Sequence, residues 1–229
     1  GNLQSVTKVN ATAGFSIVKW TSGANAYKTV GHGLGVKPQI VIIKRRDASG
    51  NWFVFYDFVD GTNDYLQLNS TAAALDAESY SIVPPTSTVF GTDGAFVGGS
   101  TGATMIAYVF SSVAGYSKFG SFVGNGNSDG TFVYTGFRVS WLMIKNASNG
   151  SAYWLMLDNK RRTFNPNGPS SSLYPNESTA ENTFGNATGI DFLSNGFKIR
   201  DSLSYVNGSG NNIIYFAFAE SPFKNSRAR

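Results

Sequence analysis

Short apolar runs separated by turns rich in glycine, asparagine and serine recur along the whole chain. Residues 40–57 run through an apolar segment, the polar stretch RRDASGN and a second apolar segment, which is the pattern of a β-hairpin. Residues 104–110 form another apolar run with aromatic positions and predict a buried strand. Helical periodicity is weak, and the best helical candidate is a turn or two within residues 70–79. The pattern predicts an all-β protein with very little helix.

The chain also repeats itself. Residues 35–57 align without gaps to residues 136–158, so that Lys44 meets Lys145 and Asp57 meets Asp158. Three further features recur in both halves: an Asn-Ser-Thr-Ala segment, a hairpin-like segment and a final aromatic strand. The order predicts two tandem β-sandwich-like, jelly-roll-like repeats. We assign residues 1–26 to a lead-in segment, 27–117 to the first repeat and 118–229 to the second. The alternative is one large two-sheet sandwich in which the repeats interleave.

The amino-acid composition excludes several kinds of catalytic and binding site. Among 229 residues there is no cysteine, which excludes disulfides and thiol catalysis, and there is one histidine, His32, between two glycines. Charged residues make up 14% of the chain, and the net charge of +4 comes from short, scattered basic clusters. Nucleic-acid binding requires a denser basic face, and no apolar run is long enough for a membrane span. We therefore expect no nucleic-acid partner, no membrane insertion and no cofactor.

Two motifs suggest catalysis or metal binding, but only in part. Asp57, Asp60 and Asp64 are close in sequence, and a glycosidase needs two carboxyl groups flanking a cleft. The stretch NGNSDG, residues 125–130, matches the first half of a calcium loop, but the position of its bidentate glutamate holds Gly136. Both stretches are also typical of turns. We predict neither a catalytic residue nor a metal ligand, and hence no enzyme.

Aromatic residues beside amides supply the candidate binding site. Strand alternation puts Trp52, Val54 and Tyr56 on one face, with Phe53 and Phe55 on the other, so both faces are apolar. One face then builds the core, while the other meets a sheet, a partner chain or a ligand. A neutral sugar would need aromatic faces and hydrogen-bonding groups rather than cations. The predicted ligand-binding residues are Trp52, Tyr56, Asp57, Asn63, Tyr65 and Asn69. The alternative is that Trp52 and Tyr56 are core residues.

Several longer motifs resemble a family of virion structural proteins from tailed bacteriophages of marine and cyanobacterial hosts. They include GHGLGVKPQIVIIKRR, GYSKFGSFVGNGNSDGTFVYTGFRVSWLMIK, DFLSNGFKIR and IYFAFAESPFKNSRAR. The resemblance covers the chain from about residue 27 onward, and it implies a tail-fibre-like module at the C-terminal end of a longer protein. Because the sequence starts at Gly1 and not at Met, we expect a processed product or a piece of a longer polypeptide that lacks its upstream part. The resemblance alone implies a homo-oligomer, with a trimer expected.

Two functions follow as expectations. The first is a tail-fibre or spike module on the exterior surface of the virion that recognises a host glycan or outer-membrane component. The alternative is a head-decoration, adaptor or spacer protein that contacts only other virion proteins. Exposed aromatic and amide groups would favour the first, and large apolar interfaces would favour the second.

Overall fold

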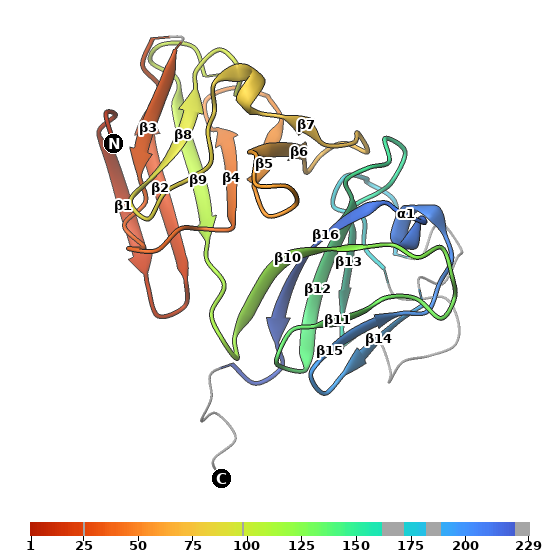
Figure 1. Cartoon of the computed structure of the whole chain (residues 1–229). Coiled ribbons are helices and arrows are strands. Elements are labelled where there is room, and N and C mark those ends of the chain that lie inside the picture. The colour runs from red at the N-terminus through yellow and green to blue at the C-terminus, as the bar shows by residue number, and fades with distance from the viewer. Residues whose placement is uncertain (25, 98, 162–171, 182–188, 223–229) are drawn as a thin grey trace. The chain divides into compact units, whose positions relative to one another are not determined.

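The computed structural model describes residues 1–24, 26–97, 99–161, 172–181 and 189–222. The described chain is almost entirely β-strand, which confirms the predicted all-β, sandwich-like fold (Figure 1). It divides into two compact units. Unit 1 comprises Gly1–Asn69 and Ala74–Ser112, and unit 2 comprises Ser70–Ala73 and Val113–Arg229.

Unit 1 is built on a seven-stranded antiparallel sheet in the order β1-β2-β9-β4-β5-β6-β7, with a separate β3-β8 pair. Its elements are β1 (Ser5–Asn10), β2 (Phe15–Thr21), β3 (Tyr27–Gly31), β4 (Ile40–Arg45), β5 (Trp52–Tyr56), β6 (Asp64–Gln67), β7 (Leu75–Asp76), the 3₁₀ turn η1 (Glu78–Tyr80), β8 (Val89–Asp93) and β9 (Thr104–Phe110).

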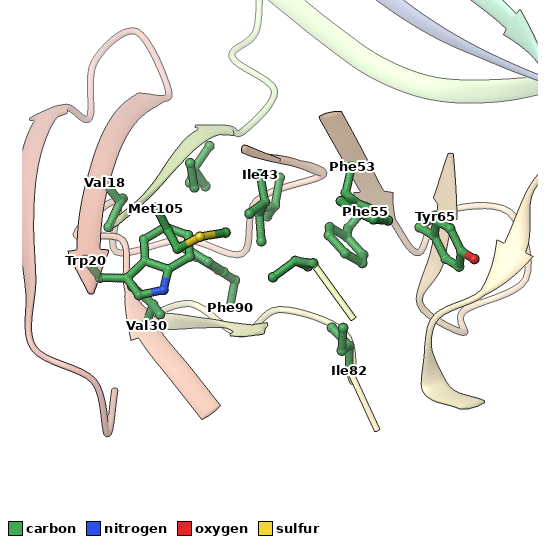
Figure 2. Packing of buried hydrophobic residues seen from close by; sticks show 14 of the residues in the cluster. Val18, Trp20, Val30, Ile43, Phe53, Phe55, Tyr65, Ile82, Phe90 and Met105 are labelled. Atoms are coloured by element: carbon green, nitrogen blue, oxygen red, sulfur yellow. The ribbon is translucent and has the colours of Figure 1, made fainter. Parts of the chain in front are cut away.

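The core of unit 1 lies between one face of the large sheet and the β3-β8 pair. Trp20 of β2 meets Phe90 of β8 edge to face, with ring centroids 5.6 Å apart. Strand alternation supplies the sheet side of the core, since every second residue of β2 and β9 is buried. Figure 2 shows this packing from Val18 and Trp20 at one end to Phe53, Phe55 and Tyr65 at the other.

Unit 2 has a four-stranded sheet in the order β10-β16-β12-β13 and a three-stranded sheet in the order β11-β15-β14. Its elements are β10 (Ser117–Val123), β11 (Phe132–Tyr134), β12 (Val139–Asn146), β13 (Leu155–Asp158), β14 (Ile190–Leu193), β15 (Gly196–Ile199), the one-turn helix α1 (Ser204–Asn207) and β16 (Asn212–Ala219). Phe197 of β15 and Tyr215 of β16 pack edge to face at 5.4 Å in its core.

The two units share one strand order. In unit 1, β2-β9-β4-β5 are neighbours, and in unit 2 the corresponding order is β10-β16-β12-β13. The registers agree as well, because Lys44 lies opposite Ile106 and Lys145 lies opposite Ile214. The internal repeat seen in the sequence is therefore also a repeat of strand topology.

The gap-free alignment is wrong beyond the hairpin turn. Val41 pairs with Phe55 in unit 1, whereas Leu142 pairs with Leu157 in unit 2, so the second turn is one residue longer. This shift makes Trp154 the structural equivalent of Trp52. Strand pairing decides the register, and the turn absorbs the extra residue.

Side-chain contacts around these tryptophans repeat the equivalence. The Trp52 backbone N–H donates to Asn69 Oδ1 at 2.9 Å, and the Trp154 N–H donates to Asn176 Oδ1 at 2.8 Å. An equivalent asparagine side chain therefore accepts the tryptophan N–H in each repeat, although the surrounding sequence differs.

The equivalent lysines cap the turns of their own hairpins. Lys44 Nζ donates to the carbonyls of Arg45 at 2.8 Å and Ala48 at 3.5 Å. Lys145 Nζ makes the corresponding bonds to Asn146 and Asn149, and it also donates to the Thr71 carbonyl of the Ser70–Ala73 segment at 3.0 Å. Lys145 is fully buried, and this burial lowers its pKa to about 8.

Three expectations need correction. Residues 1–26, expected to be a lead-in, contain β1 and β2, which are the first two strands of the large sheet. The boundary along the sequence lies between Ser112 and Val113 and not after residue 117, because β10 of unit 2 already begins at Ser117. The helix expected within residues 70–79 is reduced to the three-residue turn η1, since part of the segment pairs as β7 and part belongs to unit 2.

Candidate functional site

Four of the six predicted ligand-binding residues are buried, which corrects the predicted surface patch. They are Tyr56, Asp57, Asn63 and Tyr65. Tyr65 belongs to the core and packs edge to face on Phe96 at 4.8 Å. The chain turns back after β5, and Phe58 then lies 5.1 Å from the Tyr56 ring. These side chains cannot offer their faces to a ligand in solution.

Burial also shows in the polar atoms of this group. Asn63 Nδ2 donates to the Ile82 carbonyl at 2.8 Å, and the Asn63 N–H donates to Glu78 at 3.0 Å. Asp57 forms an ion pair with Lys37. Burial is the main cause of a strong rise in the pKa of Tyr56. Asn63 and Asp57 therefore hold the loops of unit 1 in place.

Trp52 and Asn69 remain accessible from the predicted site. Trp52 is half-buried, and its ring lies nearly parallel to that of Tyr108, with centroids 6.3 Å apart and an interplanar angle of 21°. Asn69 Nδ2 donates to Asn51 Oδ1 at 3.0 Å. The register places Trp52 beside Lys44, on the sheet face opposite the core.

Two of the carboxylates considered for glycosidase chemistry, Asp60 and Asp64, differ in their hydrogen bonding and in the direction in which their pKa is shifted. Asp60 Oδ1 accepts hydrogen bonds from the N–H of Thr62 at 2.9 Å and from its hydroxyl at 2.6 Å, which lower the pKa of Asp60. Asp64 behaves differently: burial, followed by the nearby charges of Asp60, Asp76 and Glu78, raises its pKa to about 6. Asp60 is thus a turn-forming residue, and Asp64 is destabilised in its charged form.

The half-matched calcium loop is a hydrogen-bonded turn. The Asn127 N–H donates to Asn125 Oδ1 at 3.0 Å, the Asp129 N–H donates to Asn127 Oδ1 at 2.8 Å, and Lys198 pairs with Asp129 at 2.7 Å. These side chains are engaged within the loop. Among the described residues, no group of three or more histidine, aspartate or glutamate side chains is arranged to hold a metal ion.

His32 is a buried structural residue in this fold. Its Nδ1 accepts the Leu34 N–H at 3.2 Å, and its Nε2 lies 3.2 Å from the Thr86 carbonyl, so Nε2 carries the proton. Burial, the larger effect, lowers the pKa of His32. The imidazole joins the turn after β3 to the segment before β8.

A hollow of about 460 Å³ in unit 1 was not predicted. It is lined by Tyr80, Ser81, Asp93, Ala95 and Phe96. Tyr80 and Phe96 stack with centroids 4.0 Å apart and an interplanar angle of 25°, and Tyr80 is still 47% exposed. We call this feature the Tyr80–Phe96 hollow.

The polar rim of the hollow is held by its own backbone. Asp93 Oδ1 accepts the N–H groups of Ala95 at 2.8 Å and Phe96 at 3.2 Å, which fixes the turn that carries Phe96. Ser81 adopts a left-handed conformation with φ of 60° at the end of η1. Such a conformation is uncommon for a residue other than glycine.

The hollow was missed because its two sides are separate in sequence. Tyr80 and Ser81 follow the stretch in which a helix is expected, whereas Asp93 and Phe96 lie more than ten residues further along the chain, at and after the end of β8. A single aromatic before a polar residue carries no signal of its own. The hollow arises only because Tyr80 packs on Phe96 in the folded chain.

Comparison with known proteins gives a family without an assigned activity. Residues 1–222 match the family described as "Domain of unknown function (DUF7483)". The chain belongs to this family. No curated protein matches the DUF7483 chain.

Among solved structures, one match is to BpGH86A, a beta-porphyranase of glycoside hydrolase family 86 from the human gut bacterium Bacteroides plebeius. The identity is 9% and the TM-score is 0.20, over 96% of this chain and 34% of that chain. The DUF7483 chain thus spans about a third of that enzyme's length. At this TM-score the match supports no structural or functional argument.

None of the helices in the described parts is long and apolar enough to cross a membrane.

Proposed function

We propose that this DUF7483 chain is a non-catalytic saccharide-binding module on the exterior of a phage virion, in a tail fibre or spike. The Tyr80–Phe96 hollow is the proposed binding site for a sugar ring of the host surface. The observation that carries this proposal is a stacked aromatic pair that stays half exposed at the mouth of a hollow. The virion location rests on the resemblance of the sequence motifs to phage virion proteins.

The chemistry of the hollow suits a neutral sugar. A volume of about 460 Å³ lies within the usual range of small-ligand sites. The Tyr80 ring supplies apolar contact for the C–H face of a sugar. The Ser81 hydroxyl and the Asp93 carboxylate supply hydrogen-bonding groups for its hydroxyls.

The same lining supports binding rather than hydrolysis. A glycosidase of the usual type needs two carboxyl groups across the scissile bond. Asp93 is the one carboxylate among the residues that line the hollow in the described structure, and its Oδ1 is committed to two backbone N–H groups.

A structural role as decoration, adaptor or spacer protein is the second candidate. It is favoured by exposed aromatic residues on β11 of unit 2, an edge strand of its sheet. Phe132 is 43% exposed and Tyr134 is 58% exposed. An edge strand with exposed aromatics is suited to contacts with other subunits.

The proposal is tested with Tyr80→Ala on a glycan array of host surface saccharides, with Tyr134→Ala as a matched exposed-tyrosine control. Because Tyr80 is half exposed, we expect Tyr80→Ala to unfold at nearly the wild-type temperature while losing about tenfold or more in saccharide affinity. The milder Tyr80→Phe should retain most of the binding, since the ring is kept.

Three results would contradict the proposal. One is a wild-type protein that binds no saccharide on the array. A second is a folded Tyr80→Ala protein that binds as well as wild type. The third is immunogold labelling of phage particles in which antibody against the chain fails to reach intact virions. Loss of assembly into particles with Tyr134→Ala would favour the second candidate.

A further inference from the structure

The face of the seven-stranded sheet opposite the core carries a second set of ordered side chains. Residues paired across antiparallel strands project to the same face. One such row runs from β1 to β5 as Val6, Lys19, Ile106, Lys44 and Trp52. We call this surface the second face of unit 1.

Two adjacent rows add to this surface. One contains Lys8, Ile17 and Tyr108 on β1, β2 and β9, and its continuation through Ile42 on β4 and Val54 on β5 is buried. On the other side of the first row, Thr21 pairs with Thr104, and the Arg46 N–H donates to the Thr104 carbonyl at 2.8 Å. The second face thus brings four cations to one surface, from segments up to 38 residues apart in sequence: Lys8, Lys19, Lys44 and Arg46.

These cations have no acidic partners in the part of the chain that the structure describes. Lys44 is bound only to turn carbonyls, and no ion pair involves Lys8, Lys19 or Arg46. The nearest acidic group in sequence, Asp47, is paired with Arg45 at 2.7 Å and also accepts the Thr104 N–H. Asp64 on β6 lies at the far end of the face, opposite Tyr56 on β5.

Between the cations lie apolar and hydrogen-bonding groups. Val6 is 62% exposed, and the nearly parallel Trp52 and Tyr108 rings lie at the β5 side. A groove of about 410 Å³ occupies the β1 side. It is lined by Lys19 and Arg46 together with polar groups from Gln4, Ser5, Thr21 and Thr104.

We propose that the second face binds an anionic polysaccharide, in addition to the neutral sugar site proposed above. The cations would pair with carboxylate or sulfate groups, and the threonine and glutamine side chains would bind hydroxyls. The Trp52–Tyr108 pair would pack on a sugar ring. From β1 to β5 the face measures about 19 Å at roughly 4.8 Å between strands, so it accommodates an oligosaccharide rather than a single sugar.

The mixture of groups favours a polysaccharide over a nucleic acid. A nucleic acid carries a phosphate on every nucleotide and is bound by a dense basic surface. Here the cations alternate with aliphatic residues and hydroxyls, which complements a polymer with many hydroxyls and fewer charges. Lys8, Lys19 and Arg46 are exposed and form no ion pair in the described structure, so charge complementarity stabilises binding there without the cost of breaking existing ion pairs.

The test measures binding of the full chain to four probes at low salt. The probes are polygalacturonate, dextran sulfate, uncharged dextran and a single-stranded oligonucleotide. We expect binding to one or both anionic polysaccharides that weakens as salt rises, and no binding to dextran. The polygalacturonate and dextran sulfate arms distinguish carboxylate from sulfate recognition. Binding of the oligonucleotide more tightly than either polysaccharide, or of none of the charged probes, overturns the proposal.

The double variant Lys19→Gln/Arg46→Gln removes two exposed cations from the groove. Its matched control is Lys28→Gln/Lys160→Gln, which makes the same change in net charge at positions outside the second face. We expect about a tenfold loss of affinity for the preferred polysaccharide in the first variant and less than twofold in the control. Equal losses in the two would indicate unspecific attraction and overturn the site.

Three further variants separate this surface from the Tyr80–Phe96 hollow. Trp52→Ala should weaken polysaccharide binding, and Trp52→Phe should restore much of it. Tyr80→Ala should leave it unchanged, so that failure of one site does not imply failure of the other. Thermal unfolding of each variant shows that the fold is retained.

Discussion

Replacing the equivalent tryptophans Trp154 and Trp52 with alanine should lower the free energy of unfolding by unequal amounts. Trp154 is fully buried, and its ring meets Phe216 edge to face at 6.0 Å. Trp52 occupies the same strand position in unit 1 but is only half-buried. The two substitutions remove the same atoms from the same place in the topology, so the difference isolates burial.

The magnitude follows from the apolar area that each side chain buries. A tryptophan buries roughly 150–250 Å², which at about 25 cal/mol per Å² corresponds to roughly 4–6 kcal/mol as an upper bound. Measured large-to-small core changes of this type cost about 3–5 kcal/mol. We therefore expect Trp154→Ala to cost about 4 kcal/mol and Trp52→Ala about 2 kcal/mol.

Scanning calorimetry is the suitable assay, because two units can unfold in separate transitions and a single midpoint would then mix them. The unfolding transition of unit 2 should shift to lower temperature in Trp154→Ala, and that of unit 1 should shift less in Trp52→Ala. An equal cost for the two variants, or a larger one for Trp52→Ala, would refute the assignment of Trp52 to an accessible face. A cost below about 2 kcal/mol for Trp154→Ala would refute its burial.

Two more predictions concern stability. The pKa of Asp64, raised to about 6, means that this group favours the folded state below about pH 4 and that this contribution is lost as pH rises through 6. Because Asp64 is half-buried, Asp64→Asn should stabilise the protein by only about 1 kcal/mol at pH 7.5 and not at pH 4; urea unfolding at both pH values checks this, and an equal gain at both would contradict it. A Cβ at Gly196 would overlap the Val133 carbonyl oxygen, whereas one at Gly50 would meet no atom within 4 Å. Gly196→Ala should therefore cost about 2 kcal/mol or more and Gly50→Ala less than about 0.5 kcal/mol in the same measurement, and similar costs would refute the close approach.

Local pattern was enough to predict the β class, several of the strands and the repeat. The apolar run of β9 and the polar turn after β4 are properties of neighbouring residues, so they are visible in the sequence. The alternation in β2 is visible as well, but residues 1–26 were assigned to a lead-in segment. The duplication is visible in the sequence as well, because the equivalent lysines, Lys44 and Lys145, each lie just before a polar turn. In the structure each lysine caps its turn in the same way.

The site depended on contacts that alternation does not encode. The sequence showed that both faces of β5 are apolar, but not that Phe58 would return to cover Tyr56, so Tyr56 and Trp52 could not be told apart. The equivalence of Trp154 and Trp52 was also not visible in the sequence, since a turn that is one residue longer has the same polar character.

Both proposed binding surfaces arise from tertiary structure alone. The Tyr80–Phe96 hollow needs the packing of η1 on the turn after β8, and the second face needs the strand order that places Lys8, Lys19 and Lys44 on one surface. Composition established an all-β chain rich in aromatics and poor in charge. Which aromatics are exposed and which cations lie together is decided by long-range strand pairing, because burial and proximity are properties of the assembled sheets and not of any short segment.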